Sequence, residues 1–224
     1  MKEKILLAWS GGKDSALNLE AIKNDGGYEI VSLLTTVTEG YERVSMHGVR
    51  KVLLEQQARS AGLPLDIVYI TQKATNEQYE TRMKAVLEKH KKNDVTSVAF
   101  GDLFLEDLKK YREENLAKVG MKALFPLWRT DTTELSRYFV DSGFKAVVTC
   151  VDSELLDGSF SGRDYDESFL ADLPEGVDPC GENGEFHSFV YDGPVFKRAV
   201  EIVKGEIVKR DDRFFFSDLL PKDN

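Results

Sequence analysis

A strand, a glycine-rich turn and a helix start follow one another at the beginning of the chain. The apolar run over residues 5–9 is too short for a helix and too apolar for a loop, so it predicts a buried parallel strand. Glycines in the turn let backbone amides approach a ligand, and a helix N-terminus offers unpaired N–H groups and partial positive charge, which favour phosphate. The stretch therefore predicts a phosphate-binding turn made of Ser10, Gly11, Gly12, Lys13, Asp14 and Ser15.

The turn differs from two common phosphate-binding patterns. A Walker A loop ends in Gly-Lys-Ser/Thr, whereas Lys13 is followed by Asp14, and the turn contains no Gly-x-Gly-x-x-Gly of a dinucleotide fingerprint. It resembles instead the pyrophosphate loop, Ser-Gly-Gly-x-Asp-Ser, of enzymes that cleave ATP between the α and β phosphates. This resemblance implies ATP as a ligand and Mg²⁺ on its phosphates, with Asp14 as a metal ligand. A tight strand-to-helix turn without a ligand is the alternative.

Composition narrows the class of protein. The 224 residues carry a net charge of −9 and a pI of about 5.0, which argues against a generic nucleic-acid binder. No apolar run approaches the roughly 18 residues of a membrane span, so we expect no membrane partner. The residues before the first strand leave no room for a signal peptide, and Cys150 and Cys180 form no Cys-x-x-Cys pair. We therefore expect a cytoplasmic protein without a disulfide framework.

The first half of the chain alternates between strand and helix patterns. Further strands are expected over residues 28–37, 65–70 and 95–100, and helices over 14–24, 49–60, 75–92 and 105–119. This alternation over residues 4–125 predicts a parallel, doubly wound α/β sheet with right-handed crossovers. His90 lies among lysines at a helix end and is interpreted as solvated.

The pattern changes after residue 125. We therefore expect an ATP-binding domain over residues 1–125 and a smaller, substrate-binding α+β lobe over residues 126–224. In this lobe the sequence predicts a helix over 132–142, a strand over 145–151, an acidic loop over 152–178 and a hairpin that turns at Gly205.

Polar residues follow two strands of the predicted sheet. Ligands of open α/β sheets bind beyond the carboxyl ends of the strands. Thr35 and Thr36 either flank the adenine or ribose or are plain strand residues. Gly101 and Asp102 follow another strand, and the Asp102 carboxylate either holds Mg²⁺ or a ribose hydroxyl, or caps the next helix. The polar stretch 38–48 is expected to form a loop over the site.

A second dense group of functional side chains lies within residues 178–196. Glu182 and Glu185 supply carboxylates, and His187 can transfer protons or hydrogen-bond a carboxylate substrate. Cys180 is interpreted as mainly structural, because neighbouring glutamates disfavour a thiolate. A metal site made of these four residues is conceivable, although the spacing matches no standard zinc pattern.

The two motifs together carry a more specific resemblance. Residues 10–15 and the run Cys-Gly-Glu-Asn-Gly-Glu-Phe-His-Ser at residues 180–188 are similar to those of the diphthine-ammonia ligase family. Shorter matches at residues 46–49, 101–102, 111–113 and 126–128 extend the resemblance over essentially the whole chain. It implies an adenine nucleotide alpha hydrolase-like (HUP) domain followed by a smaller substrate lobe. It also implies ATP-dependent amidation of the diphthine carboxylate of elongation factor 2 to diphthamide, with release of AMP and pyrophosphate.

This resemblance leads to an expected mechanism. The acceptor carboxylate attacks the α phosphate to give an acyl adenylate, and ammonia then forms the amide. Lys13 stabilises the departing pyrophosphate, and Glu182, Glu185 and His187 place the acceptor and move protons. Because the nucleotide strand begins at residue 4, we expect no N-terminal glutaminase domain, and ammonium as the nitrogen source. Two alternatives stay open: a related adenylating amide ligase for a small-molecule carboxylate in bacterial cofactor salvage, and a non-catalytic ATP-binding sensor.

Overall fold

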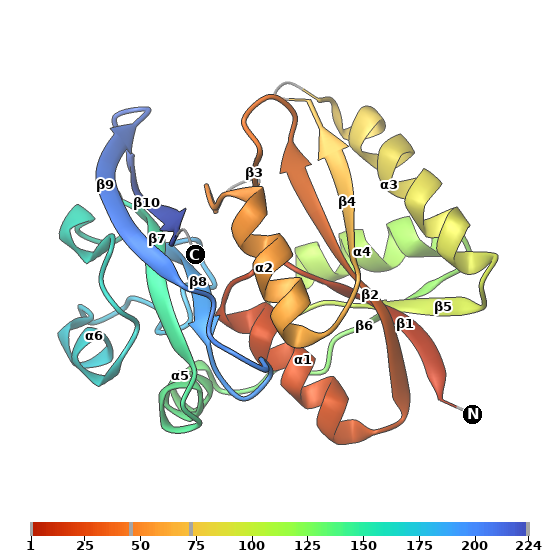
Figure 1. The fold of residues 1–224 in the computed structure, drawn as a ribbon, viewed down its shortest axis with the longest axis horizontal. Coiled ribbons are helices and arrows are strands. Elements are labelled where there is room, and N and C mark those ends of the chain that lie inside the picture. Colours follow the sequence, from red (N-terminus) through yellow and green to blue (C-terminus); the bar gives the residue numbers. More distant parts are fainter. Residues whose placement is uncertain (1, 45–46, 72–73, 223–224) are drawn as a thin grey trace.

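The computed structural model describes residues 2–44, 47–71 and 74–222, and it contains two β-sheets with helices around them (Figure 1). Met46, part of the motif predicted at residues 46–49, lies outside the described residues. Within these ranges no helix has the length and apolar character needed to span a membrane. The expected cytoplasmic location stays a prediction.

The first sheet has the order β4-β2-β1-β5-β6, and these strands run parallel. They are β1 (Glu3–Ala8), β2 (Tyr28–Thr38), β4 (Leu65–Ile70), β5 (Val95–Ala99) and β6 (Lys122–Leu124), with the short β3 (Arg43–Val44) antiparallel to the end of β2. The helices between them are α1 (Lys13–Asp25), α2 (Lys51–Ala61), α3 (Asn76–Lys91) and α4 (Glu106–Lys118). The elements predicted for the first half are confirmed, with small differences at their ends.

Helices cover both faces of this sheet because its strands are apolar on both sides. On β1, Ile5 and Leu7 lie in the core that includes residues of α1 and α2, whereas Leu6 lies in the core that includes residues of α3 and α4. Side chains of a strand alternate between faces, so an apolar run buries both. The predicted parallel, doubly wound α/β sheet is confirmed (Figure 1).

The strand order places a crevice beside β1. This strand pairs with β2 on one side and with β5 on the other. The connections that leave β1 and β5 therefore diverge, and ligands of such sheets bind where they separate. The phosphate turn follows β1, and Gly101 and Asp102 follow β5. The topology alone brings these two predicted segments to one place.

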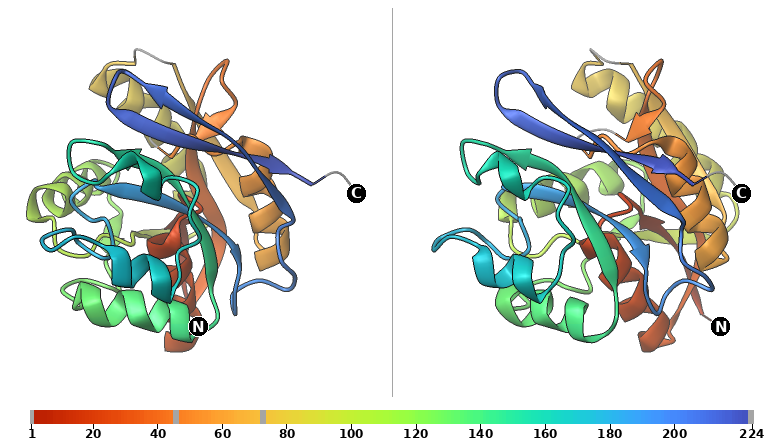
Figure 2. Two further views of the ribbon diagram at one scale, coloured as in Figure 1. Left: turned by 90° about the vertical axis from the view of Figure 1, so that its left-hand side faces the viewer. Right: turned by 60° about the vertical axis from the view of Figure 1, so that its left-hand side comes forward.

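The second sheet is antiparallel, with the order β8-β7-β10-β9. Its strands are β7 (Lys145–Asp152), β8 (Phe186–Asp192), β9 (Ile202–Arg210) and β10 (Phe214–Pro221), and its helices are α5 (Thr132–Asp141) and α6 (Glu167–Asp172). Figure 2 shows β9 and β10 as a long ribbon that reaches toward α2. There Asp218 of β10 forms ion pairs with Arg43 and Arg50, which connect the two halves of the chain.

The second half differs from prediction in three places. β9 continues through Gly205, where its pairing with β10 shifts in register, and the hairpin instead turns at residues 211–213 between β9 and β10. The second motif, within residues 178–196, contains β8, for which no strand was predicted. The stretch 152–178 includes a 3-10 turn at Gly158–Phe160 and helix α6, whose N-cap Asp166 accepts a hydrogen bond from Phe169 N. Short elements of this kind are stabilised by local caps and tertiary contacts rather than by long periodic patterns.

One apolar core joins the two halves. Leu17 of α1 and Phe189 of β8 belong to the same cluster of buried side chains. The predicted boundary between residues 125 and 126 falls between β6 and α5, and the division into two domains stays a prediction. His90 differs from its interpretation as solvated: it is buried, and its Nε2 lies 2.9 Å from Asp66 Oδ2, because the end of α3 packs against β4.

Candidate active site

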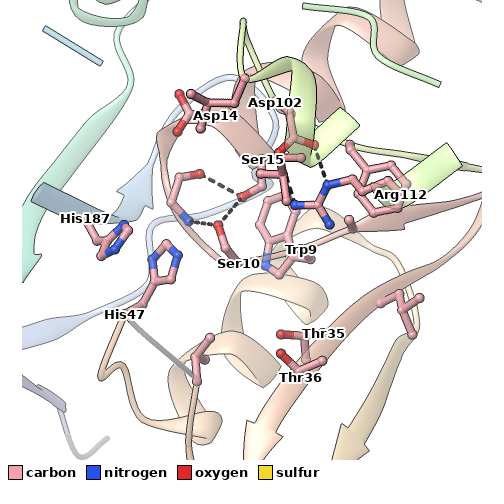
Figure 3. A pocket seen from close by; sticks show the side chains of 18 of the residues that line it. Trp9, Ser10, Asp14, Ser15, Thr35, Thr36, His47, Asp102, Arg112 and His187 are labelled. Atoms are coloured by element: carbon pink, nitrogen blue, oxygen red, sulfur yellow. Dashed lines mark hydrogen bonds and ion pairs between the residues drawn. The ribbon is translucent and has the colours of Figure 1, made fainter. Parts of the chain in front are cut away.

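The predicted phosphate turn lies between β1 and α1 and is stabilised by two serine hydroxyls (Figure 3). Gly12 N donates to Ser10 Oγ at 3.2 Å, and Ser15 Oγ donates to Gly12 O at 2.8 Å. The two hydroxyl oxygens lie 3.4 Å apart. Ser10 and Ser15 therefore hold the shape of the turn from within.

Gly11 is where the turn meets the rest of the molecule. Its φ of 80° lies in the left-handed region, and a Cβ there would lie 2.7 Å from Gln57 Oε1, so the position requires glycine. Gln57 of α2 is 0% exposed; it accepts from Trp9 Nε1 at 2.9 Å and donates to Gly11 O at 2.9 Å and Val190 O at 2.6 Å. Val190 N also donates to Gly11 O at 2.9 Å. One buried amide thus connects the end of β1, the turn, α2 and β8.

Lys13 connects the turn to the second motif. Its ammonium, on a residue only 3% exposed, forms an ion pair with Asp14 at 2.8 Å, donates to Cys180 O and lies 5.7 Å from the Phe186 ring centroid. Its backbone N donates to Ser188 Oγ at 3.2 Å. Burial is the largest single effect on the pKa of Lys13 and lowers it, but Asp14, Cys180 and Glu182 together outweigh burial and raise the pKa, so the ammonium stays charged at neutral pH.

A cavity of about 520 Å³ opens beside the turn. Its size suits a nucleotide or another small ligand. The cavity is lined by most of the residues that the sequence singled out: Ser10, Gly12, Lys13, Asp14, Ser15, Thr35, Thr36, Gly101, Asp102, Cys180, Glu182 and His187. Gly11 and Glu185 are described but do not line it.

Thr35 offers a hydrogen-bonding group without a protein partner. The residue is 4% exposed, and its Oγ1 is buried without a hydrogen-bond partner among the described residues. A buried hydroxyl that makes no hydrogen bond carries a free-energy cost, which a ligand in the cavity would remove. This orphaned hydroxyl faces a cavity that a nucleotide would fit, and the contact of Thr35 with a nucleotide stays a prediction.

Gly101 and Asp102 bring the end of β5 against α1. A Cβ on Gly101 would lie 2.8 Å from Asp14 O, so only glycine allows this close approach. The interpretation of Asp102 as a helix cap is wrong, because α4 begins at Glu106 with Leu105 at its N-cap. The Asp102 carboxylate, on a residue 8% exposed, instead pairs with Arg112: Oδ2 lies 2.7 Å from Arg112 Nε (Figure 3).

The two glutamates of the second motif have different environments. Glu182 lines the cavity, and its Oε1 accepts from Leu103 N at 2.9 Å. Burial raises the pKa of Glu182 to about 7. Glu185 is 4% exposed and accepts from Asp178 N, Asn183 N and Asn183 Nδ2, each at 3.0 Å. Its position does not match the expected catalytic role, because these donors hold its carboxylate inside the 178–185 turn, away from the cavity.

His187 lies against a second histidine. The His187 and His47 rings are tilted by 31°, with centroids 4.4 Å apart, and both line the cavity. Burial lowers the pKa of His187 to about 4 and lowers that of His47 well below its ordinary value. Both rings are therefore neutral at pH 7. His47 lines the cavity, so the described part of the stretch 38–48, which includes the short strand β3, reaches the site.

The cysteine and the carboxylates do not assemble a metal centre of their own. Cys180 is buried, its Sγ donates to Thr132 O at 3.4 Å, and burial raises the pKa of the thiol to about 12, which suits a structural role. Across the described residues no group of three or more His, Cys, Asp and Glu side chains is placed to hold a metal ion, so the conceivable site of Cys180, Glu182, Glu185 and His187 is not formed. Mg²⁺ fits here only as an ion that nucleotide phosphates carry, with Asp14 as a carboxylate beside the turn.

Both motifs lie in regions of the chain that match known protein families. Residues 1–123 match the family model described as the diphthamide synthase N-terminal domain, and residues 131–217 match the model of the diphthamide synthase C-terminal domain. The chain belongs to the diphthamide synthase family. The resemblance predicted from the two motifs is confirmed, and with it the expectation of a ligase-type enzyme.

Curated relatives of this diphthamide synthase family member carry the name diphthine–ammonia ligase. The human protein is 25% identical over 221 residues, which are 89% of this chain and 82% of that protein. The Danio rerio protein is 29% identical over 92% of this chain and 89% of its own length. The Schizosaccharomyces pombe protein is 28% identical over 92% of this chain but only 37% of its own, longer length.

One solved structure is also similar to this diphthamide synthase family member. It is described as a predicted subunit of tRNA methyltransferase from Methanocaldococcus jannaschii, with 16% identity and a TM-score of 0.41 over 67% of this chain and 78% of that chain. A score this low adds nothing to the fold assignment, which rests on the sheet topology.

Two residues of this site have no role predicted from the sequence. Gln57 is the larger of the two buried polar residues of α2, next to the apolar Leu53, Leu54 and Ala58, and that contrast is a signal that could have found it. Arg112 lies within the match at residues 111–113, but it belongs to the highly charged α4, and the sequence assigned it no role. The pairing of Arg112 with Asp102 becomes visible only in three dimensions.

Proposed function

We propose that this diphthamide synthase family member is an ATP-dependent ligase that activates a carboxylate as an acyl adenylate and converts it to an amide with ammonia. One observation carries this proposal: the phosphate turn and the second motif meet at a single cavity. Lys13 of the turn contacts Cys180 O through its ammonium and Ser188 Oγ through its backbone N–H. A nucleotide on the turn would therefore lie next to an acceptor held by residues 180–188.

Activation addresses a basic chemical problem. A carboxylate does not react with ammonia at neutral pH, because oxide would have to leave, whereas an acyl adenylate releases AMP. The turn amides and Lys13 would stabilise the negative charge that grows on the departing pyrophosphate. Lys13 would reach that charge if its ammonium exchanged the Asp14 carboxylate for a phosphate oxygen, and the freed Asp14 carboxylate would then be available to hold Mg²⁺. When bound, Mg²⁺ neutralises phosphate charge.

Glu182 is the group best placed to take a proton. Its carboxylate lies on the cavity wall, and its pKa of about 7 leaves it partly ionised at neutral pH. A general base works best when its pKa lies near the working pH. Glu182 would accept the proton lost as ammonia becomes the amide nitrogen. The neutral rings of His187 and His47 would position the acceptor through hydrogen bonds rather than through charge.

The acceptor is proposed from the relatives. Because the curated relatives are named diphthine–ammonia ligase, we assign the acceptor as the carboxylate of diphthine on elongation factor 2, with ammonium as the nitrogen source. A small-molecule carboxylate and a sensor role without catalysis are the competing outcomes of the test.

The test measures AMP released from ATP with Mg²⁺ and ammonium, with and without diphthine-bearing elongation factor 2. AMP that depends on the acceptor supports both the chemistry and the substrate. If the protein binds ATP but elongation factor 2 does not increase AMP release, small carboxylates are tested as acceptors. If no carboxylate leads to AMP release, a sensor role is favoured. Glu182→Gln should abolish acceptor-dependent AMP or amide formation. Glu175→Gln, the same change at an exposed position of the second lobe, is the matched control.

A further inference from the structure

Arg112 forms a fixed, flat part of the cavity wall. It projects from α4, and both Arg112 and Phe100 line the cavity. The guanidinium pairs with the Asp102 carboxylate: Nη2 donates to Oδ1 at 3.1 Å, and Nε lies 2.7 Å from Oδ2 in an ion pair without hydrogen-bond geometry. Its Cζ lies 4.3 Å from the Phe100 ring centroid. Carboxylate and ring together hold the plane of the guanidinium.

These contacts determine which part of Arg112 is available. One edge of the guanidinium, formed by Nε and Nη2, faces Asp102, and Asp102 is itself buried, so separating the pair would leave an unpaired carboxylate inside the protein. Arg112 is therefore a poor candidate to turn this edge toward a phosphate. A guanidinium held in this way offers a planar surface, and such planes stack on aromatic rings and on nucleobases.

The rest of the cavity wall shows which part of a nucleotide this surface suits. In the view of Figure 3, Ser10 and Ser15 of the phosphate turn lie between Arg112 on one side and His47 and His187 on the other. The histidine side carries the second motif. The Arg112 side is continued by apolar side chains from β2, α3 and α4, namely Leu34, Met83, Leu87 and Leu108. A nucleotide whose phosphates occupy the turn and whose acceptor lies at the second motif has its base on the apolar side.

From this arrangement we propose that Arg112 binds the purine base of ATP by stacking, with Phe100 supporting the guanidinium and Asp102 fixing its plane. This inference rests on the proposed use of ATP. Stacking of a base on a side chain contributes about 1–3 kcal/mol, which corresponds to roughly 5- to 150-fold in affinity. Loss of the flat surface should weaken binding of the base and leave binding of the phosphates unchanged.

The experiment compares two ligands by isothermal titration calorimetry in the presence of Mg²⁺: ATP, and inorganic tripolyphosphate, which lacks base and ribose. Arg112→Lys keeps the positive charge but removes the plane. It should weaken ATP binding at least 5-fold and change tripolyphosphate binding by less than 2-fold. Arg129→Lys makes the same change at a residue 75% exposed and outside the cavity, and should alter neither. Thermal melts establish that each variant is folded.

Two results would overturn the inference. If Arg112→Lys binds ATP as tightly as wild type, Arg112 does not stack on the base. Equal weakening of ATP and tripolyphosphate would identify Arg112 as a phosphate ligand instead. Wild-type protein that binds neither ligand would refute the proposed function itself, so the two failures are distinguishable.

Discussion

Replacement of Gln57 by methionine tests the connection between the phosphate turn and the second sheet. Methionine has a similar length and volume but cannot donate or accept the three hydrogen bonds that Gln57 makes to Trp9, Gly11 and Val190. The Gly11 carbonyl keeps its bond from Val190 N. The Trp9 indole N–H loses its acceptor, Gln57 Oε1, and the Val190 carbonyl loses its donor, Gln57 Nε2. Each buried polar group left without a partner costs about 1–3 kcal/mol, so the variant should lose about 2–6 kcal/mol of its free energy of unfolding.

Urea unfolding followed by circular dichroism measures this loss. The signal from circular dichroism is preferable to tryptophan fluorescence, because Trp9 is itself a partner of Gln57. The midpoint should fall while the slope with urea stays the same, since the two proteins expose similar surface on unfolding. Gln56→Met changes the neighbouring, half-buried glutamine and serves as the matched control.

The function of the turn should change as well. At a temperature where Gln57→Met is fully folded, its affinity for ATP should be lower than that of Gln56→Met, because Gly11 is held less firmly. A Gln57→Met protein with the stability of wild type, to within about 0.5 kcal/mol, would refute the assignment of Gln57 as the residue that holds the turn.

Three further predictions concern the cavity wall. Lys13→Met should lower the rate of AMP formation by roughly 10²–10³-fold but weaken ATP binding far less, because the charge on the pyrophosphate grows in the transition state. Equal losses in rate and in affinity would contradict the role of Lys13 in stabilising the departing pyrophosphate. The folded-state pKa of Glu182 is raised to about 7, so ionisation of this carboxyl destabilises the fold. Wild type should therefore lose stability relative to Glu182→Gln as the pH rises from about 4.5 to 7. Melting temperatures of both proteins across this range measure the trend, and a constant difference between them would argue against the raised pKa. Gly101→Ala should destabilise the protein by about 1–3 kcal/mol and weaken ATP binding, because the new methyl group would meet the Asp14 backbone. Gly27→Ala is the control, because the nearest atom there belongs to the flexible side chain of Asp25. Equal stability of the two variants would exclude the close approach of Gly101 to Asp14.

The first sheet was predictable because its signals are local. A short apolar run predicts a buried strand, a glycine pair followed by a helical pattern predicts the turn, and repeated alternation predicts the parallel sheet. Strand order then brings the ends of β1 and β5 together. The second sheet was less predictable, because its pairing is antiparallel and non-local. Gly205 illustrates this limit: the residues around it read as a hairpin, yet β9 continues through it and pairs along β10.

Residue type and the spacing between near neighbours were enough to predict the phosphate turn, the doubly wound sheet and a set of candidate residues, and the two motifs together predicted the family. Which of those candidates face the cavity depends on the folded chain. Glu182 and Glu185 lie three positions apart and have the same chemistry. The turn over residues 178–185 buries the Glu185 carboxylate on its own amides, whereas Glu182 faces the cavity. Gln57, Arg112 and His47 likewise acquire their places from partners distant in sequence. Burial and pairing set the energy of a polar group, and both are properties of the folded chain rather than of any short segment.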